Sequence, residues 1–215
     1  MAIQQSPSGK ALLILLSLLG WFALAAQFYL QISTHLVTLA ESITRYFSYF
    51  TILTNLMVAI CCTVLWLAPG SRAGQFFARS QTATAIAVYI SIVALIYNGI
   101  LRSLWQPEGL QKLLDNLLHL VIPLLFILYW GIFVPKATLQ WKNLYAWLLY
   151  PLCYILYVLI RGAFSGFYPY PFISVTALGM TQTLINSVGV AVLFVIVSFI
   201  FIGIGKGVSR KNNLS

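Results

Sequence analysis

Charged side chains are scarce in this 215-residue chain, at 7% of positions, and only three of them are acidic. Soluble domains carry roughly a quarter charged residues, so this composition excludes a soluble globular domain. Hydrophobic residues occupy 61% of positions instead, which is typical of an integral membrane protein. The net charge of +9 predicts no nucleic-acid partner, because the basic residues are scattered in short loops rather than interleaved with exposed aromatics.

Residues that bind metals are also few. The three cysteines, Cys61, Cys62 and Cys153, lie in apolar runs, and the two histidines are His35 and His119. None of them has the CxxC or HxxxH spacing of a metal site. A haem site at His119 would lack a second intramembrane histidine. We therefore expect no metal and no cofactor.

Long apolar runs dominate the rest of the chain. A helix needs about 20 apolar residues to cross about 30 Å of hydrocarbon. There is no convincing internal repeat of the kind found in secondary transporters, and no alternating pattern of a membrane barrel. The expected fold is all-α, a polytopic bundle of six transmembrane helices forming a single domain over residues 1–215. The helices are expected at residues 10–32, 44–68, 82–102, 113–134, 144–162 and 183–205.

Basic residues predict the orientation of this bundle. Loops on the cytoplasmic side of a membrane carry the excess of Lys and Arg. Eight such residues fall on one side and four on the other, which predicts that both termini lie in the cytoplasm (N-in/C-in). The cytoplasmic set is Lys10, Arg72, Arg79, Lys136, Lys142, Lys206, Arg210 and Lys211, and the outer set is Arg45, Arg102, Lys112 and Arg161.

Polar side chains of five expected helices fall at one depth, in the outer half of the bundle. Polar groups inside a bilayer are costly, so their clustering indicates a site. The inner halves are nearly all apolar and offer no lining for a channel. The polar set comprises Ser48, Thr51, Thr54, Asn55, Asn98, Arg102, Lys112, Asp115, Asn116, His119, Arg161, Thr181, Gln182, Thr183 and Asn186.

Within this set His119 is the strongest functional candidate, because an intramembrane histidine needs a partner. Asp115 lies four residues earlier, on the same helical face, where its carboxylate is placed to accept a hydrogen bond from the imidazole. Pro123 lacks the N–H that would bond the carbonyl of His119. We expect a kink there that opens space around the imidazole.

The same residues also have structural interpretations. Thr51 or Thr54 would then bond only a carbonyl one turn back. Arg102 and Arg161 would be interfacial anchors whose charged ends reach the surface. Asp115 would be a solvated helix start.

An aromatic segment, residues 166–172, has the sequence Gly-Phe-Tyr-Pro-Tyr-Pro-Phe. One interpretation is an ordinary aromatic belt at the membrane surface. The other is a rigid lid over the outer site, because two prolines restrict the backbone around Tyr168 and Tyr170.

Three segments occur along the chain in this order: Tyr49-Phe50-Thr51, then Asn116-Leu117-Leu118-His119 followed by Pro123, then the aromatic segment. Together they resemble the androgen-induced-protein-like integral membrane family, especially its bacterial branch. The likeness spans about residues 45–175, and the aromatic segment is its most specific part. Eukaryotic members are threonine hydrolases of fatty acid esters of hydroxy fatty acids.

The resemblance implies that Thr51 is a nucleophile and His119 its base, with Thr54 as the competing nucleophile. A threonine hydroxyl needs such a base to attack an ester. Asp115 would then orient the imidazole as the third member of a triad. Side-chain N–H groups of Asn55, Asn98 or Asn186 would stabilise the oxyanion. A fatty acid carboxylate would bind beside Arg102 or Arg161, beneath the lid residues Tyr168 and Tyr170.

Two functions from different classes therefore compete. The first is an intramembrane lipid-ester hydrolase in a bacterial inner membrane, taking fatty-acyl ester substrates sideways from membrane lipids into its outer half. The second is a non-catalytic membrane protein or transporter that binds a lipid or small solute in the same cavity. The composition alone does not decide between them.

The orientation is directly testable with reporter enzymes fused after residues 75 and 106. We expect a reporter active only outside the cell to be silent at Gln75 and active at Gln106, because Arg72 and Arg79 retain the loop between the second and third helices in the cytoplasm. Activity of the outside reporter at Gln75 would contradict N-in/C-in.

Overall fold

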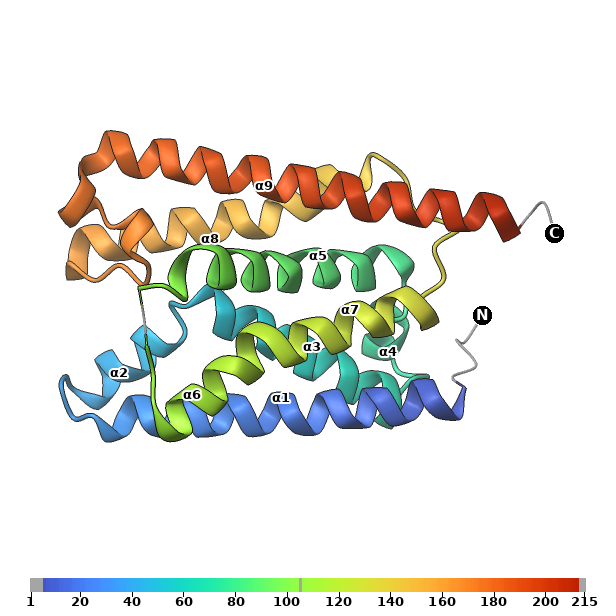
Figure 1. Cartoon of the computed structure of the whole chain (residues 1–215), viewed down its shortest axis with the longest axis horizontal. Helices are drawn as coiled ribbons and strands as arrows, with labels where there is room; N and C mark the ends of the chain where they lie inside the picture. Colours follow the sequence, from blue (N-terminus) through green and yellow to red (C-terminus); the bar gives the residue numbers. More distant parts are fainter. Residues whose placement is uncertain (1–5, 105, 213–215) are drawn as a thin grey trace.

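The structure, a computed structural model, describes residues 6–104 and 106–212 and contains no strand within them. Figure 1 shows an elongated bundle of helices lying roughly along one axis. Two segments, Tyr97–Leu101 and Leu117–Val121, are π-helical, and Pro171–Ile173 is a 3-10 turn. The α-helices are α1 (Pro7–Ser33), α2 (Leu39–Tyr46), α3 (Phe50–Leu67), α4 (Arg72–Phe77), α5 (Ser80–Ile96), α6 (Gly109–Asn116), α7 (Ile122–Phe133), α8 (Asn143–Ser165) and α9 (Val175–Asn212).

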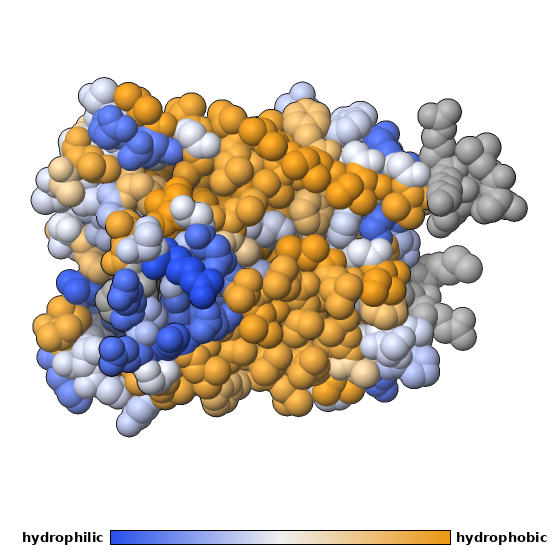
Figure 2. Space-filling view, in the orientation of Figure 1, coloured by the Kyte–Doolittle hydropathy of each residue, from blue (hydrophilic) through white to orange (hydrophobic). Residues whose placement is uncertain are grey.

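Six helical segments in the described residues are long and apolar enough to cross a membrane. The expected all-α, six-helix, multi-pass fold is therefore confirmed. On the face drawn in Figure 2, apolar residues cover a broad area over the middle of the bundle, and polar residues gather mainly toward its ends. The segments are Pro7–Ser33, Phe50–Leu67, Ser80–Leu101, Gly109–Phe133, Asn143–Ser165 and Val175–Ser209.

The prediction of one continuous helix over residues 44–68 is wrong at its start. The chain forms the short helix α2 up to Tyr46 and begins α3 only at Phe50. Thr38 caps α2 by accepting a hydrogen bond from the Glu41 N–H at 3.3 Å. Apolar residues continue across the break, so hydrophobicity alone did not reveal it.

The last helix also differs from the expected span of residues 183–205. Helix α9 begins at Val175 and is interrupted at Gly179, whose backbone has φ 77° and ψ 162°. Positive φ is a conformation that glycine adopts without steric cost. Beyond this break α9 runs back along the length of the bundle, against α8 and α5 (Figure 1).

The helices differ greatly in how much they are buried. Helix α5 is largely enclosed, with contacts to α3, α7 and α9, whereas α8 packs chiefly against α9 and is mostly exposed. Gly20 of α1 approaches α3 so closely that an added Cβ would lie 3.0 Å from the Cβ of Ala59. Small residues permit such close helix contacts in membrane proteins.

Lys136, just beyond α7, is buried despite its charge. Its ammonium donates hydrogen bonds to the carbonyls of Trp130 and Gly131 at 2.9 Å and of Val134 at 2.7 Å. These carbonyls at the end of α7 are thereby satisfied. Burial lowers the pKa of Lys136, because it penalises the charged form.

Lys136→Met is expected to reduce the free energy of unfolding by about 2 kcal/mol, because three carbonyls lose a charged donor. The matched control is Lys142→Met, since Lys142 is exposed. Thermal midpoints of the two variants and the parent protein in the same detergent measure the effect. Equal midpoints for both variants would show that the buried ammonium does not stabilise the bundle.

Candidate functional site

The start of α3 is buried, and tyrosine hydroxyls satisfy its backbone. The first N–H groups of a helix have no partner within the helix. Here the Phe50 N–H donates to the Tyr154 hydroxyl, and the Thr51 N–H donates to the Tyr170 hydroxyl, both at 3.2 Å. Tyr154 in turn donates to the carbonyl of Ser48 at 2.8 Å. Thr51 is therefore fixed in the first turn of α3 by α8 and the aromatic segment.

Two π-helical segments form the opposite wall of the site. Pro123 cannot donate to the carbonyl of His119, and the helix is π-helical just before it, over Leu117–Val121. The carbonyl of His119 instead accepts a hydrogen bond from the side-chain amide of Asn98 at 3.1 Å. Asn98 belongs to the other π-helical segment, and such segments occur frequently at functional sites.

The imidazole of His119 is held by three contacts. Its Nδ1 lies 2.9 Å from the main-chain carbonyl of Asp115 and 3.4 Å from the Asp115 carboxylate. Tyr97 stacks on the ring, with centroids 3.7 Å apart and planes at 16°. The Tyr97 hydroxyl donates to the other carboxylate oxygen of Asp115. Both neighbours of Nδ1 are acceptors, so the proton of the neutral ring belongs on Nδ1 and Nε2 carries the lone pair.

Thr51 faces this lone pair. Its Oγ1 lies 3.3 Å from Nε2 of His119 and 3.3 Å from the Tyr170 hydroxyl. Because Nε2 accepts, the Thr51 hydroxyl donates to it, and Tyr170 then donates to Thr51. Thr51 is only 7% exposed, so this chain of hydrogen bonds is sheltered from bulk solvent.

Thr54, the competing threonine, is bonded elsewhere. It is fully buried, and its hydroxyl lies 3.3 Å from the hydroxyl of Tyr150. Of the two threonines, Thr51 is the one placed beside the imidazole of His119. Within residues 6–104 and 106–212, no three His, Cys, Asp or Glu side chains gather closely enough to hold a metal ion.

The three asparagines that were expected to stabilise an oxyanion donate instead to main-chain carbonyls. Asn55 donates to the carbonyls of Thr51 and Leu118, at 2.9 and 3.2 Å, and Asn98 to those of Ala94 and His119. The amide hydrogens of these two are therefore occupied by the backbone. Asn186 donates to the carbonyl of Phe172, which ties α9 to the aromatic segment.

Tyr170 is the donor best placed beside Thr51. Burial raises the pKa of its hydroxyl, so the group stays protonated and able to donate. Its ring stacks on Phe172, with centroids 5.4 Å apart, and meets Tyr49 edge-on at 5.8 Å. By contrast, the Tyr168 ring packs where a side chain on Gly162 would lie.

The two arginines expected to bind a fatty acid carboxylate, Arg102 and Arg161, lie outside the hydrogen-bonded network of Thr51 and His119. Arg161 forms an ion pair of 2.8 Å with Glu41, which also binds Arg45 at 2.8 Å. Hydrogen bonding from Arg45, helped by Arg161, lowers the pKa of Glu41. The guanidinium groups of Arg45 and Arg161 also lie over the ring of Phe167, so this cluster fastens the aromatic segment to α2 and α8. Arg102 is exposed and donates to Asn98 at 2.9 Å.

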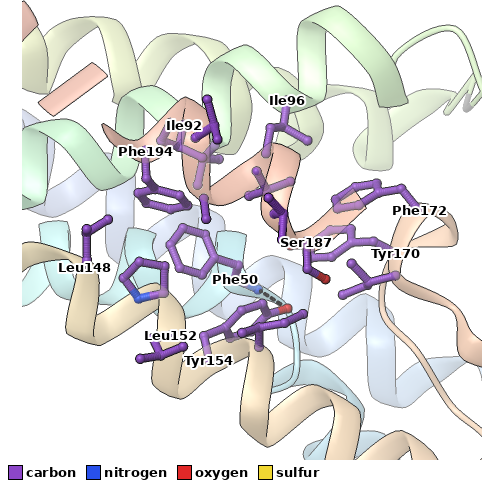
Figure 3. A pocket seen from close by; sticks show the side chains of 18 of the residues that line it. Phe50, Ile92, Ile96, Leu148, Leu152, Tyr154, Tyr170, Phe172, Ser187 and Phe194 are labelled. Atoms are coloured by element: carbon purple, nitrogen blue, oxygen red, sulfur yellow. Dashed lines mark hydrogen bonds between the residues drawn. The ribbon is translucent and has the colours of Figure 1, made fainter. Parts of the chain in front are cut away.

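Two cavities meet at Thr51. One of about 470 Å³ extends between α5, α8 and α9 and is almost entirely apolar, with Phe50 and Phe194 among its walls (Figure 3). The other, of about 520 Å³, lies between α1, α6 and the aromatic segment and contains Asp115 and His119. Four residues line both cavities: Thr51, Tyr97, Leu101 and Tyr170.

The sequence interpretation missed the roles of Tyr97 and of the tyrosines on α8. Tyr97 gave no signal, since an aromatic residue in an apolar helix usually packs in the core. Tyr150, Tyr154 and Tyr157 follow helical spacing in α8, and their hydroxyls bond to Thr54, Ser48 and the chain around Phe50. That spacing was the available signal for a polar face on α8 directed at α3.

Comparisons with known proteins add no relatives to this description. No protein-family model matches the chain, and no curated protein and no solved structure matches it either. The chemistry of the site is therefore inferred from its geometry.

Proposed function

We propose that this protein is an intramembrane lipid-ester hydrolase in which Thr51 is the nucleophile and His119 the general base. The observation that carries the proposal is the 3.3 Å separation of Thr51 Oγ1 and His119 Nε2, with Nδ1 held by Asp115. A nucleophile, a base and a group that orients the base form the arrangement that activates hydroxyl nucleophiles.

In the first half of the reaction, Thr51 Oγ1 attacks the ester carbonyl carbon while its proton moves to Nε2 of His119. The carbonyl electron pair moves onto oxygen, giving a tetrahedral intermediate. The intermediate collapses by breaking the bond to the alcohol oxygen, which takes the proton from His119. The products of this half are a free alcohol and an acyl ester of Thr51.

In the second half, a water molecule repeats the sequence. His119 takes a proton from the water as its oxygen bonds to the acyl carbon, and Thr51 leaves with that proton. A fatty acid is released, and Thr51 and His119 return to their starting states.

Two features support stabilisation of the negative charge that develops. Thr51 lies in the first turn of α3, where the helix dipole favours negative charge. The Tyr170 hydroxyl beside Thr51 is placed to turn from Thr51 Oγ1 to the oxyanion. The helix dipole is fixed before substrate binds, and Tyr170 needs only a rotation of its hydroxyl.

The setting favours a lipid substrate. The apolar cavity beside Thr51 opens among residues of α8 and α9 that are exposed on the apolar surface of the bundle. The resemblance to the androgen-induced-protein-like family adds fatty acid esters of hydroxy fatty acids as candidate substrates. With N-in/C-in orientation, the reaction would take place in the outer half of a bacterial inner membrane.

Purified protein should hydrolyse long-chain esters, and its Thr51 should react with a serine/threonine-directed fluorophosphonate. His119→Ala is expected to lower kcat/KM by about 10²- to 10⁴-fold, the usual contribution of a general base. Thr51→Ala should abolish labelling. The matched control is Thr54→Val, because Thr54 lies away from the imidazole.

Turnover by His119→Ala equal to that of the parent would contradict the proposal. So would labelling that disappears in Thr54→Val and persists in Thr51→Ala. Binding of the ester without turnover in all variants would instead favour the non-catalytic lipid-binding alternative.

The Tyr97 hydroxyl is expected to position the base through its hydrogen bond to Asp115. Tyr97→Phe keeps the stacked ring and removes only the hydrogen bond to Asp115. Loss of one bond to a charged group predicts about a tenfold fall in kcat with little change in KM. An unchanged kcat in a folded variant would show that this bond does not contribute to positioning His119.

A further inference from the structure

The two cavities that meet at Thr51 have different access to His119. The imidazole lines the cavity between α1, α6 and the aromatic segment, together with Asp115. It is not among the described residues that line the cavity between α5, α8 and α9. Thr51 and Tyr170 line both, so an ester bound at Thr51 extends one arm into each cavity.

The reaction chemistry decides which arm goes where. The leaving alcohol must take its proton from Nε2 of His119, and the water that replaces it must give a proton to the same atom. Alcohol and water therefore occupy the cavity lined by His119, which we call the alcohol cavity. The acyl group stays bonded to Thr51 and occupies the other, which we call the acyl cavity.

The acyl cavity fits an unbranched hydrocarbon chain. Along α8 its lining extends from Tyr154, beside the start of α3, to Tyr145. A helix rises about 1.5 Å per residue, so the stretch from Tyr145 to Tyr154 corresponds to about 13 Å. Figure 3 shows apolar side chains closing around this space from α8 on one side and α9 on the other, including Leu148, Leu152 and Phe194.

The alcohol cavity is chemically different. Its walls include Gln27, Gln31 and Thr34 of the α1 end and Gln111 of α6. The amides of Gln27 and Gln111 bond to each other, at 2.9 and 3.4 Å, so both groups of that pair are ordered and directed between the two helices. Neutral amides and hydroxyls bind hydroxyl groups by donating and accepting hydrogen bonds.

The charge of the cavity walls further restricts which alcohols the cavity accepts. Asp115 is the sole charged side chain among the described residues that line the alcohol cavity. Arg161 is already paired with Glu41, and Arg102 donates to Asn98 at the exposed surface. A carboxylate in this cavity would meet the acidic side chain of Asp115 and no lysine or arginine among the described lining residues, and like charges repel.

Building on the proposed hydrolase function, we infer that the preferred substrate is a straight-chain fatty acyl ester of a neutral, hydroxyl-bearing alcohol such as glycerol. The acyl chain lies between α8 and α9, and the alcohol lies between α1 and α6. Esters whose alcohol carries a carboxylate near the ester bond are disfavoured by Asp115.

The first test concerns the acyl cavity. Ala191 of α9 lines it, and Ala191→Phe places a ring across the path of a long chain. For monoacylglycerols of increasing chain length, the ratio of kcat/KM for C16 over C8 acyl groups should fall about tenfold or more. Ala146→Phe, exposed on α8 and outside the lining, is the control and should keep the parent ratio.

The second test concerns the alcohol cavity. The parent protein should cleave a monoacylglycerol at least about tenfold faster, in kcat/KM, than the same acyl group esterified to a 3-hydroxy acid, and Gln111→Leu should reduce that preference. Thr51-dependent hydrolysis of p-nitrophenyl butyrate serves as a separate measure of the basic reaction.

The outcomes distinguish the two levels of proposal. Absence of Thr51-dependent cleavage of every ester, p-nitrophenyl butyrate included, would overturn the hydrolase itself. Cleavage of p-nitrophenyl butyrate with an unchanged chain-length ratio in Ala191→Phe would overturn the acyl assignment alone. Equal or faster cleavage of the hydroxy acid ester would overturn the assignment of a neutral alcohol.

Discussion

The site depends on one constraint: helix α3 begins buried inside the bundle, where its first N–H groups need hydrogen-bond partners from other segments. An unsatisfied backbone group in such surroundings costs several kcal/mol. Tyr154 and Tyr170 remove that cost by accepting from Phe50 and Thr51. The same hydroxyls connect α3 to α8 and to the aromatic segment, so the backbone requirement and the placement of Thr51 have a common solution.

On the side of the site that carries His119, buried backbone groups likewise take their hydrogen-bond partners from side chains. The helix before Pro123 leaves main-chain carbonyls without their usual donors, and the amides of Asn55 and Asn98 fill those positions. These asparagines thereby join three helices at the level of the imidazole. The asparagines expected from the sequence to donate to a substrate bind the backbone instead, and the hydroxyl that lies beside Thr51 Oγ1 belongs to Tyr170.

Along the length of the bundle, residues that stabilise the helices lie apart from the residues of the proposed site. Far from the site, the buried ammonium of Lys136 closes the end of α7. Near the site, Glu41 and two arginines hold the aromatic segment against α2 and α8. Between them the exposed helix α8 borders a cavity that reaches Thr51, so the proposed hydrolase would take its acyl chain from the membrane without opening the bundle.

Composition and periodicity determined the membrane class, the six spans and the short list containing Thr51 and His119, because apolar length and misplaced polar groups are local properties of the chain. The i, i+4 spacing also brought Asp115 beside His119, although its nearest contact there is the main-chain carbonyl. Only the tertiary structure placed Thr51, and not Thr54, beside the imidazole of His119. It also broke the expected helix before Phe50 and placed Tyr97 and Tyr170. Those outcomes depend on contacts between helices far apart in the sequence, which no single-helix pattern contains.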